Sequence, residues 1–209
     1  MHGGFVATQA PEIIKTERLT LRRPALADAA DVYAYAHDPE VTRYLVWPTH
    51  TEIGDSLAFL AACGPRWGSG EEYCWVITIA PKDRVVGTIG CRVREYTADF
   101  GYVLRRAYWG RGYATEAARA VVTWLRSLPG VCRIWATCDA ENRASVRVLE
   151  KAGLSCEGWL RRSTIRPNLS STPRDTFVFA WMRDEVVEPL PNVCQFRRQA
   201  VYKRQGGTL

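Results

Sequence analysis

Residues 104–117 read LRRAYWGRGYATEA. An extended run ends at Leu104, a Gly-x-Gly loop follows at Gly110 and Gly112, and an amphipathic segment starts near Tyr113. The unpaired N–H groups at the start of such a helix, together with the helix dipole, bind phosphate without a lysine. Glycine at the two loop positions lets a ligand approach the main chain. The stretch therefore predicts a strand, an anion-binding loop and a helix.

Taken alone, a Gly-x-Gly sequence before a helix most often marks a simple turn. This one differs from the dinucleotide-binding fingerprint because no third glycine follows, and it lacks the Gly-Lys-Ser/Thr of a P-loop. The motif therefore needs support from the rest of the chain.

Hydrophobic periodicity outside this stretch predicts a mixed α/β fold. Apolar residues at helical spacing run from Ala114 to Leu125 and end before Pro129. The expected strands cover 19–22, 74–79, 85–90, 99–104, 133–138, 154–162 and 176–182, and the expected helices cover 25–37, 51–64, 114–128 and 142–153. Because the strands come first as a hairpin meander and then alternate with helices, they predict one mixed sheet flanked by helices.

The composition indicates one folded domain with an extension. The 209 residues are 47% hydrophobic and 24% charged, which supports a core and excludes a wholly disordered or coiled-coil chain. We expect a domain over residues 1–188 and a basic extension over 189–209. No apolar run approaches the roughly 20 residues of a membrane helix, and residues 1–4 lack the features of a secretory signal. We therefore expect a cytoplasmic protein without a membrane partner.

The cysteines and histidines favour neither a metal centre nor a disulfide framework. The chain has three histidines and seven cysteines, an odd number, and the cysteines are never spaced as C-x-x-C. We expect all seven thiols to be small apolar core residues: Cys63, Cys74, Cys91, Cys132, Cys138, Cys156 and Cys194.

Much of the net charge of +6 comes from the C-terminal residues. Four basic residues lie in 195–209, which contains no acid, so +2 remains for the rest of the chain. This charge is scattered, as on an ordinary solvated surface. Nucleic acid is therefore a runner-up partner.

The glycine stretch resembles the acetyl-CoA signature of the GNAT superfamily of N-acetyltransferases, Arg/Gln-x-x-Gly-x-Gly/Ala. In this sequence the pattern lies on Trp109, Gly112 and Ala114, with tryptophan in place of Arg or Gln. Further segments are similar to the RimJ/RimL branch of ribosomal-protein N-terminal acetyltransferases, namely 16–24 (TERLTLRRP), 38–45 (DPEVTRYL), 139–154 (DAENRASVRVLEKAGL) and Arg174-Asp175. Together these segments cover about residues 13–185 in the order and spacing of the family.

The resemblance implies the GNAT fold, an α/β architecture with helices around a mixed, mostly antiparallel central sheet. That sheet is splayed between its fourth and fifth strands, here 99–104 and 133–138. The implied activity is acetyl transfer from acetyl-CoA to a primary amine by direct attack in a ternary complex.

The resemblance also places the acetyl-CoA. Pantetheine would bind the main chain of Tyr102, Val103 and Leu104, and an N–H near Val103 or Leu104 would stabilise the oxyanion. The diphosphate would bind a run of N–H groups, with an added charge from the Arg111 side chain: Gly110, Arg111, Gly112, Tyr113, Ala114 and Thr115.

Three polar side chains are expected at the reaction centre. The resemblance implies that Ser145 protonates the leaving CoA thiolate, although a hydroxyl in a first helical turn also satisfies backbone groups. Asn142 would contact the cofactor or a substrate amide, and its position also suits a helix N-cap. Asp99 stands where the branch often carries glutamate and would accept the amine proton; the other interpretation is a surface aspartate at a strand end.

Trp47 and Trp67 are expected to line the acceptor pocket, with Trp67 in an exposed loop; core packing is the other interpretation for both.

The expected acceptor is a protein or peptide N-terminal α-amine, and a small-molecule amine is the alternative. The alternative of another class is a non-catalytic acyl-CoA-binding or RNA-associated module. The expected partners are acetyl-CoA and the amine, no metal is expected, and a homodimer is left open.

Overall fold

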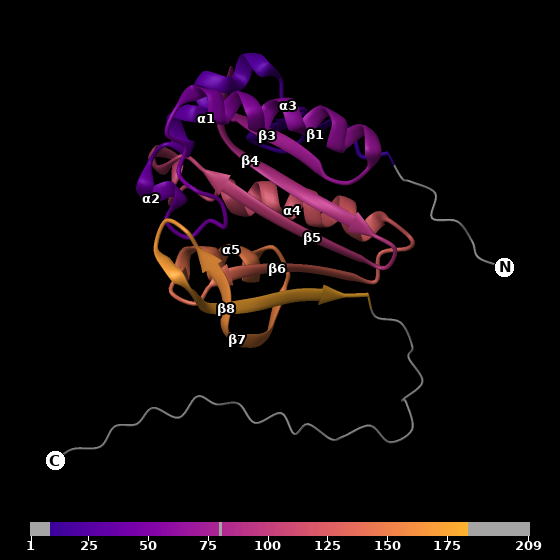
Figure 1. Ribbon diagram of the computed structural model, residues 1–209. Coiled ribbons are helices and arrows are strands. Elements are labelled where there is room, and N and C mark those ends of the chain that lie inside the picture. The colour runs from indigo at the N-terminus through magenta and orange to yellow at the C-terminus, as the bar shows by residue number, and fades with distance from the viewer. Residues whose placement is uncertain (1–8, 80, 184–209) are drawn as a thin grey trace, which may run out of the picture.

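Eight strands form one twisted sheet in the computed structural model, which describes residues 9–79 and 81–183 (Figure 1). The strands are β1 (Ile13–Lys15), β2 (Leu19–Arg22), β3 (Tyr73–Ile79), β4 (Lys82–Arg94), β5 (Thr97–Leu104), β6 (Arg133–Asp139), β7 (Ser155–Arg166) and β8 (Ser170–Met182). Their order across the sheet is β1-β2-β3-β4-β5-β6-β8-β7. Every pair is antiparallel except β5 with β6, which confirms a mixed and mostly antiparallel sheet.

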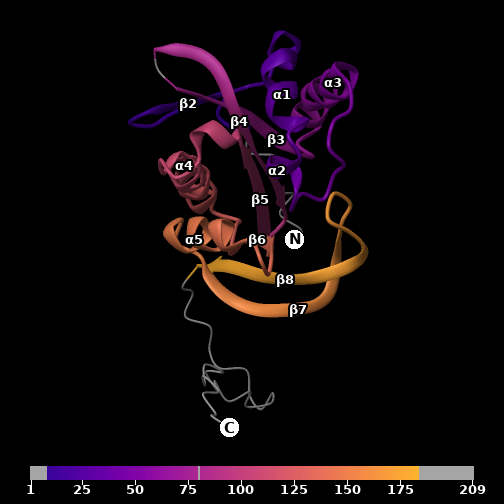
Figure 2. The same ribbon diagram turned by 90° about the vertical axis from the view of Figure 1, so that its left-hand side faces the viewer.

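Helices cover both faces of the sheet. They are α1 (Ala29–Ala36), α2 (Pro39–Thr42), α3 (Ile53–Ser69), α4 (Tyr113–Ser127) and α5 (Arg143–Lys151), with 3-10 turns η1 (Leu26–Asp28) and η2 (Arg106–Tyr108). Figure 2 shows α4 and α5 on one side of β5 and α1, α2 and α3 on the other. Among the described residues, no helix has both the length and the apolarity that crossing a membrane requires.

The sheet separates between β5 and β6. These two strands pair at only three positions, and the last pair joins Asp99 to Trp135. Beyond it, residues 100–104 stay paired with β4 on one side and have no strand partner on the other among the described residues. The splay expected between the fourth and fifth strands is confirmed; these strands are labelled β5 and β6 because the short β1 precedes them.

The alanine-rich face of α4 holds this helix against the sheet. Ala117, Ala118, Val121 and Leu125 are completely buried, in the same core cluster as Trp75 of β3. Small side chains let the helix approach the strands closely, and the larger ones fill the space that remains. Burial of this stripe is what positions the first turn of α4 beside the end of β5.

Helix α3 is longer than the sequence predicts. A stop was expected at Gly64-Pro65, yet the helix continues to Ser69 and ends at Gly70. An internal proline costs a helix about 3 kcal/mol. Burial of Trp67 in the last turn offsets this cost, because its ring packs edge-on against Tyr73 and Trp75 at centroid distances of 5.2 and 5.1 Å. The prediction of an exposed loop at Trp67 was wrong.

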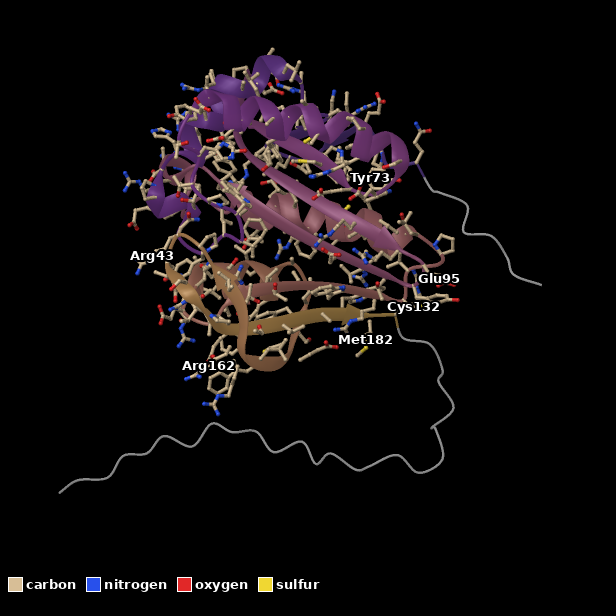
Figure 3. All side chains as sticks on the ribbon, in the orientation of Figure 1. Arg43, Tyr73, Glu95, Cys132, Arg162 and Met182 are labelled. Carbon is tan, nitrogen blue, oxygen red and sulfur yellow. The ribbon has the colours of Figure 1, made fainter. Side chains whose placement is uncertain are left out.

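Strands β7 and β8 form a longer hairpin than expected and reach across to α2 (Figure 2). Its ladder changes register between Leu160 and Thr164, where Arg162 adopts a φ of 47° and its N–H donates to Asp175 Oδ1 at 2.9 Å. Such bulges bend strands. The Arg162 side chain points away from the sheet (Figure 3). The tip of the hairpin lies beside α2, where Asn168 donates to the Thr42 carbonyl. The expected boundary at residue 188 lies outside the described residues.

We expect Gly87→Ala to destabilise the protein. A Cβ at Gly87 on β4 would lie 2.3 Å from the main-chain oxygen of Val103, a contact that only backbone movement relieves. The free energy of unfolding should fall by about 1–3 kcal/mol in a denaturant titration. The matched control is Gly158→Ala on β7, where a Cβ meets nothing within 4 Å and stability should change by less than about 0.5 kcal/mol. Equal stability of the two variants would contradict this close approach.

Candidate active site

The gap between β5 and β6 opens into a cavity with a volume of about 1380 Å³. Its wall comes from both faces of the sheet: the start of α4 and the first turn of α5 on one side, and α2 with the loop after it on the other. Pockets for one drug-sized ligand usually measure about 300–1000 Å³. The cavity therefore has room for a long ligand and a second molecule.

The glycine loop has the geometry of an anion site. Gly110 and Gly112 have φ values of 74° and 80°, which disfavour any residue with a Cβ. The main-chain N–H groups of residues 110–115 donate to no atom of the described residues, and Gly112 provides no side-chain cap for α4. These N–H groups therefore remain free beside the cavity at the positive end of a helix dipole.

A hydrogen-bonded cluster supports this loop. Glu116 on α4 accepts from the Thr16 hydroxyl at 2.6 Å, and from the main-chain N–H and Nε of Arg18 at 2.8 and 2.7 Å. Burial opposes ionisation of Glu116, but the hydrogen bonds from Thr16 and Arg18 outweigh it and lower the pKa of Glu116. Arg18 Nη1 also donates to the carbonyl of Arg111 at 3.0 Å. The β1–β2 turn thus clamps the glycine loop, a role that sequence analysis did not assign to residues 16–18.

The edge of β5 presents alternate residues to the gap. The N–H of Arg105 donates to Val86 O at 2.8 Å, and antiparallel pairing alternates, so the main-chain groups of Val103 point toward β4. Those of Tyr102 and Leu104 point into the gap. The Leu104 carbonyl accepts from Trp109 Nε1 at 2.6 Å. The Leu104 N–H faces the same gap, where it has no strand partner among the described residues. Trp109, the departure from the family signature, therefore braces the strand end against the loop.

Two hydroxyl groups meet across the gap. The Tyr102 hydroxyl lies 2.7 Å from Ser145 Oγ on α5, and burial raises the pKa of Tyr102, so the phenol stays protonated near neutral pH. Asn142 Oδ1 accepts from the Ser145 N–H at 3.1 Å, which confirms the N-cap interpretation of Asn142. The Ser145 hydroxyl is paired with Tyr102, not with a backbone group. Sequence analysis considered only the main chain of Tyr102 and missed its hydroxyl.

Asp99 lies at the last pair between β5 and β6 and lines the cavity. Its Oδ2 accepts from Nε and Nη2 of Arg92 at 3.0 and 2.6 Å. The side chain is 14% exposed, so it is neither a free surface residue nor an uncommitted base. Its proposed role in proton removal stays a prediction.

One asparagine side chain bonds to three main-chain groups in and after α2. Asn168, at the tip of the β7–β8 hairpin, accepts from the Thr49 N–H and donates to the carbonyls of Thr42 and Trp47, each at 2.8 Å. It thereby ties the hairpin to the loop after α2. Trp47 lines the cavity as expected, whereas Trp67 lies in the core and is not part of the lining.

The described residues include no group of three or more Cys, His, Asp or Glu side chains that could hold a metal ion. Four cysteines are buried as expected: Cys63, Cys74, Cys91 and Cys138. The expectation of a core position was wrong for Cys156, which is exposed on the edge strand β7, and Cys132 is half-buried. Cys194 lies outside the described residues.

Comparison with known proteins identifies the family. Residues 18–155 match the model of the acetyltransferase (GNAT) domain. The N-acetyltransferase p20 of Bacillus licheniformis is 31% identical over 153 residues, which cover 72% of this chain and 86% of that protein. The N-acetyltransferase YoaA of Bacillus subtilis is 30% identical over 171 residues, 80% of this chain and 95% of the relative.

Solved structures agree with this result. A GNAT acetyltransferase from Bacillus anthracis has a TM-score of 0.71 at 28% identity and covers 81% of this chain and 98% of its own. The acetyltransferase from Salmonella typhimurium that modifies the N-terminal serine of ribosomal protein L7/L12 has the same fold, with a TM-score of 0.72 at 17% identity over 83% of this chain and 100% of its own. The chain therefore belongs to the GNAT family. It is an acetyl-CoA-dependent acyltransferase.

We expect Gly112→Asp to reduce acetyl-CoA affinity by at least about a hundredfold, because a carboxylate would crowd and repel the diphosphate. The matched control is Gly153→Asp, which has a comparable φ of 90° but lies outside the cavity lining. Calorimetry should show near-normal affinity for the control, even if both variants lose similar stability. If Gly112→Asp binds acetyl-CoA with unchanged affinity, the diphosphate does not bind at this loop.

Proposed function

We propose that this enzyme acetylates the N-terminal α-amine of a protein or peptide by direct attack on acetyl-CoA within a ternary complex. The observation that carries the proposal is the cavity itself, which extends from the free N–H groups of residues 110–115 to Trp47 on the other face of the sheet. Donor and acceptor therefore reach the gap between β5 and β6 from opposite faces. Direct transfer requires such a meeting point and no protein nucleophile.

The free N–H groups of the glycine loop would hold the diphosphate, and the unpaired edge at Tyr102 and Leu104 would hold the pantetheine amides. Acetyl-CoA supplies an activated thioester, in which the new C–N bond forms as the C–S bond breaks. The Leu104 N–H points into the gap and would stabilise the oxyanion. The Ser145 hydroxyl would donate its proton to the departing sulfur and regain one from the Tyr102 hydroxyl 2.7 Å away, with solvent reprotonating Tyr102.

An α-amine requires little help to lose its proton. Its pKa of about 8 leaves roughly one molecule in ten neutral at pH 7, whereas a lysine side chain with a pKa of about 10.4 is neutral far less often. The Asp99 carboxylate already accepts two hydrogen bonds from Arg92. Water beside Asp99 would therefore be enough to carry the proton from an α-amine, which favours this acceptor over a lysine.

Structural neighbours support both acceptor classes. The Salmonella enzyme named above acts on a protein N-terminus. The microcin C7 self-immunity acetyltransferase MccE, whose TM-score is 0.73 at 21% identity, was solved with acetyl-CoA and AMP. A small-molecule amine therefore remains the second candidate.

The acceptor class is tested with labelled acetyl-CoA in a cell lysate. Mass spectrometry should find the label on polypeptide N-termini when the enzyme is added. The Gly112→Asp variant serves as the background control. Label confined to small metabolites would overturn the protein-acceptor proposal and support the second candidate.

We expect Ser145→Ala to lower kcat by about 10²-fold or more, since the thiolate loses its proton donor. Tyr102→Phe should lower kcat less, because Ser145 keeps its hydroxyl but loses its partner. Asp99→Asn should cost less than about tenfold, since water can accept the proton. Steady-state kinetics with saturating acetyl-CoA separates the three, and a larger loss in Asp99→Asn than in Ser145→Ala would reverse the assigned roles.

The pH dependence follows from the same assignment. With a peptide acceptor, kcat/KM should rise with pH, reach half of its limiting value near pH 8, where about half of the α-amine is neutral, and level off near pH 9. No fall is expected up to pH 10, because burial raises the pKa of Tyr102 above its ordinary value of 10 and keeps the phenol protonated. A decrease between pH 8 and pH 9 would contradict a proton held on Tyr102.

A further inference from the structure

Helix α5 carries a row of basic side chains along the cavity. Arg143, Arg147 and Lys151 lie four residues apart, so they follow one side of the helix over about 12 Å. All three residues are exposed and all three line the cavity. This row, the basic face of α5, therefore presents its donors to any ligand that the cavity holds.

The basic face of α5 has no acidic partner in the described part of the chain. None of its three side chains forms an ion pair or a hydrogen bond there, whereas other arginines, such as Arg18 and Arg92, pair with a carboxylate. Glu141 also lines the cavity, but it pairs with Arg174 at 3.0 Å. Glu150, the one acid within α5, is not part of the lining. The positive charge of this face is therefore available to an anion.

The stability of α5 does not account for this row. Arg143 is the first residue of the helix, where the helix dipole disfavours a positive charge. Like charges four residues apart on a helix also repel one another. Only Lys151, in the last turn, has the position that the dipole favours. The row as a whole therefore weakens the helix, and a bound anion would offset the repulsion.

Helix α5 extends from the gap to α4. Its first turn places Ser145 Oγ 2.7 Å from the Tyr102 hydroxyl, in the gap between β5 and β6. At its other end, the carbonyl of Lys151 accepts from Nε of Arg119 on α4 at 2.7 Å. Figure 2 shows the two helices on the same side of the sheet. The basic face of α5 therefore follows the cavity from the gap toward α4, the helix that begins at the glycine loop.

Acetyl-CoA contains an anion for which the glycine loop does not account. Besides its diphosphate, CoA carries a phosphate monoester on the 3′ oxygen of the ribose, which separates the two groups by one sugar. A phosphate monoester has a charge of about −1.5 to −2 at pH 7. The free N–H groups of residues 110–115 provide for the diphosphate alone. The 3′-phosphate requires cations of its own, close to the start of α4.

We propose that the basic face of α5 binds the 3′-phosphate of CoA, so that the enzyme discriminates against thioesters that lack this phosphate. Arg147 is the central residue, and its neighbours in the row lie about 6 Å away along the helix axis on either side. An arginine fork presents two donors to two phosphate oxygens. The inference rests on the proposed placement of the diphosphate at residues 110–115 and assigns a second subsite to the same cofactor.

Wild-type protein provides the first test, in calorimetry with CoA and with 3′-dephospho-CoA. The Kd of 3′-dephospho-CoA should be at least about tenfold higher, since it lacks the anion. Because the basic face is exposed, salt screens the interaction, and the difference should shrink as the salt concentration rises. Equal Kd values at low salt would overturn the proposal without any variant.

Variants then assign the difference to the basic face. Arg147→Gln should raise the Kd of CoA by about tenfold and leave the Kd of 3′-dephospho-CoA unchanged. Arg147→Lys should retain part of the preference, because lysine keeps the charge without the planar fork. The matched control is Arg161→Gln, which removes the same charge from an exposed arginine on β7 outside the lining and should behave as wild type.

A solvated surface predicts a different outcome. If the basic face binds no phosphate, Arg147→Gln will change the two Kd values equally or leave both unchanged, and either result refutes the proposal. Thermal unfolding of Arg147→Gln should occur at the same temperature as in the wild type or higher, since one repulsion is removed. A weaker affinity for CoA in that variant then cannot result from loss of the fold.

Failure of the proposed function gives a separate result. The calorimetry contains no amine, so it remains valid if no acceptor is acetylated. Normal CoA affinity in Gly112→Asp would contradict the placement of the diphosphate. The comparison of CoA with 3′-dephospho-CoA does not involve residue 112, and it decides the role of the basic face by itself.

Discussion

The loss of pairing between β5 and β6 after Asp99 is the constraint on which the rest of the site depends. Main-chain groups inside a sheet normally bond to a neighbouring strand, and an unpaired edge attracts another chain. Here the antiparallel pairing of β5 with β4 turns the free groups of Tyr102 and Leu104 into the gap. Because α4 and α5 pack beside this gap, the anion-binding loop and Ser145 lie along the same opening.

The two sides of the gap differ in the groups that they present to the cavity. On the side of α4, the cavity offers free main-chain N–H groups and a helix dipole, a kind of site that tolerates many side chains. Trp109 illustrates this tolerance, because an indole bonded to the Leu104 carbonyl occupies the signature position of Arg or Gln. On the other side, side chains such as Trp47 and Arg166 line the cavity. Acceptor choice is therefore a property of this chain more than of its fold.

Local patterns in the sequence predicted the features that arise locally. The apolar stripe of α4, the glycine loop and the Asn142 cap each depend on residues within a few positions of one another, and all three appear as expected. The end of α3 was predicted wrongly because Gly64-Pro65 is a strong local stop, whereas burial of Trp67 is a tertiary effect. A local sequence signal fails to predict the structure wherever packing between distant residues contributes more free energy than the local preference.

Long-range pairings were beyond the reach of sequence patterns. The contact of Glu116 with Thr16 and Arg18 joins residues about one hundred positions apart. The local sequence around either segment does not indicate that the two segments meet. Arg166 is a similar case, since its buried Nε and Nη2 donate to no atom of the described residues and Asp139 is already bound by Arg174. In the sequence, Arg166 is one more basic residue in a strand rich in arginine.

The attachment of Asn168 to the loop after α2 affects how this enzyme can be re-engineered. The loop after α2 and the tip of the β7–β8 hairpin are more than one hundred residues apart in the sequence, and a single carboxamide aligns them. Grafting one segment from a relative would leave the other without its anchor. Loop exchange between such enzymes should therefore move both segments as a unit, with the asparagine and its three partners kept together.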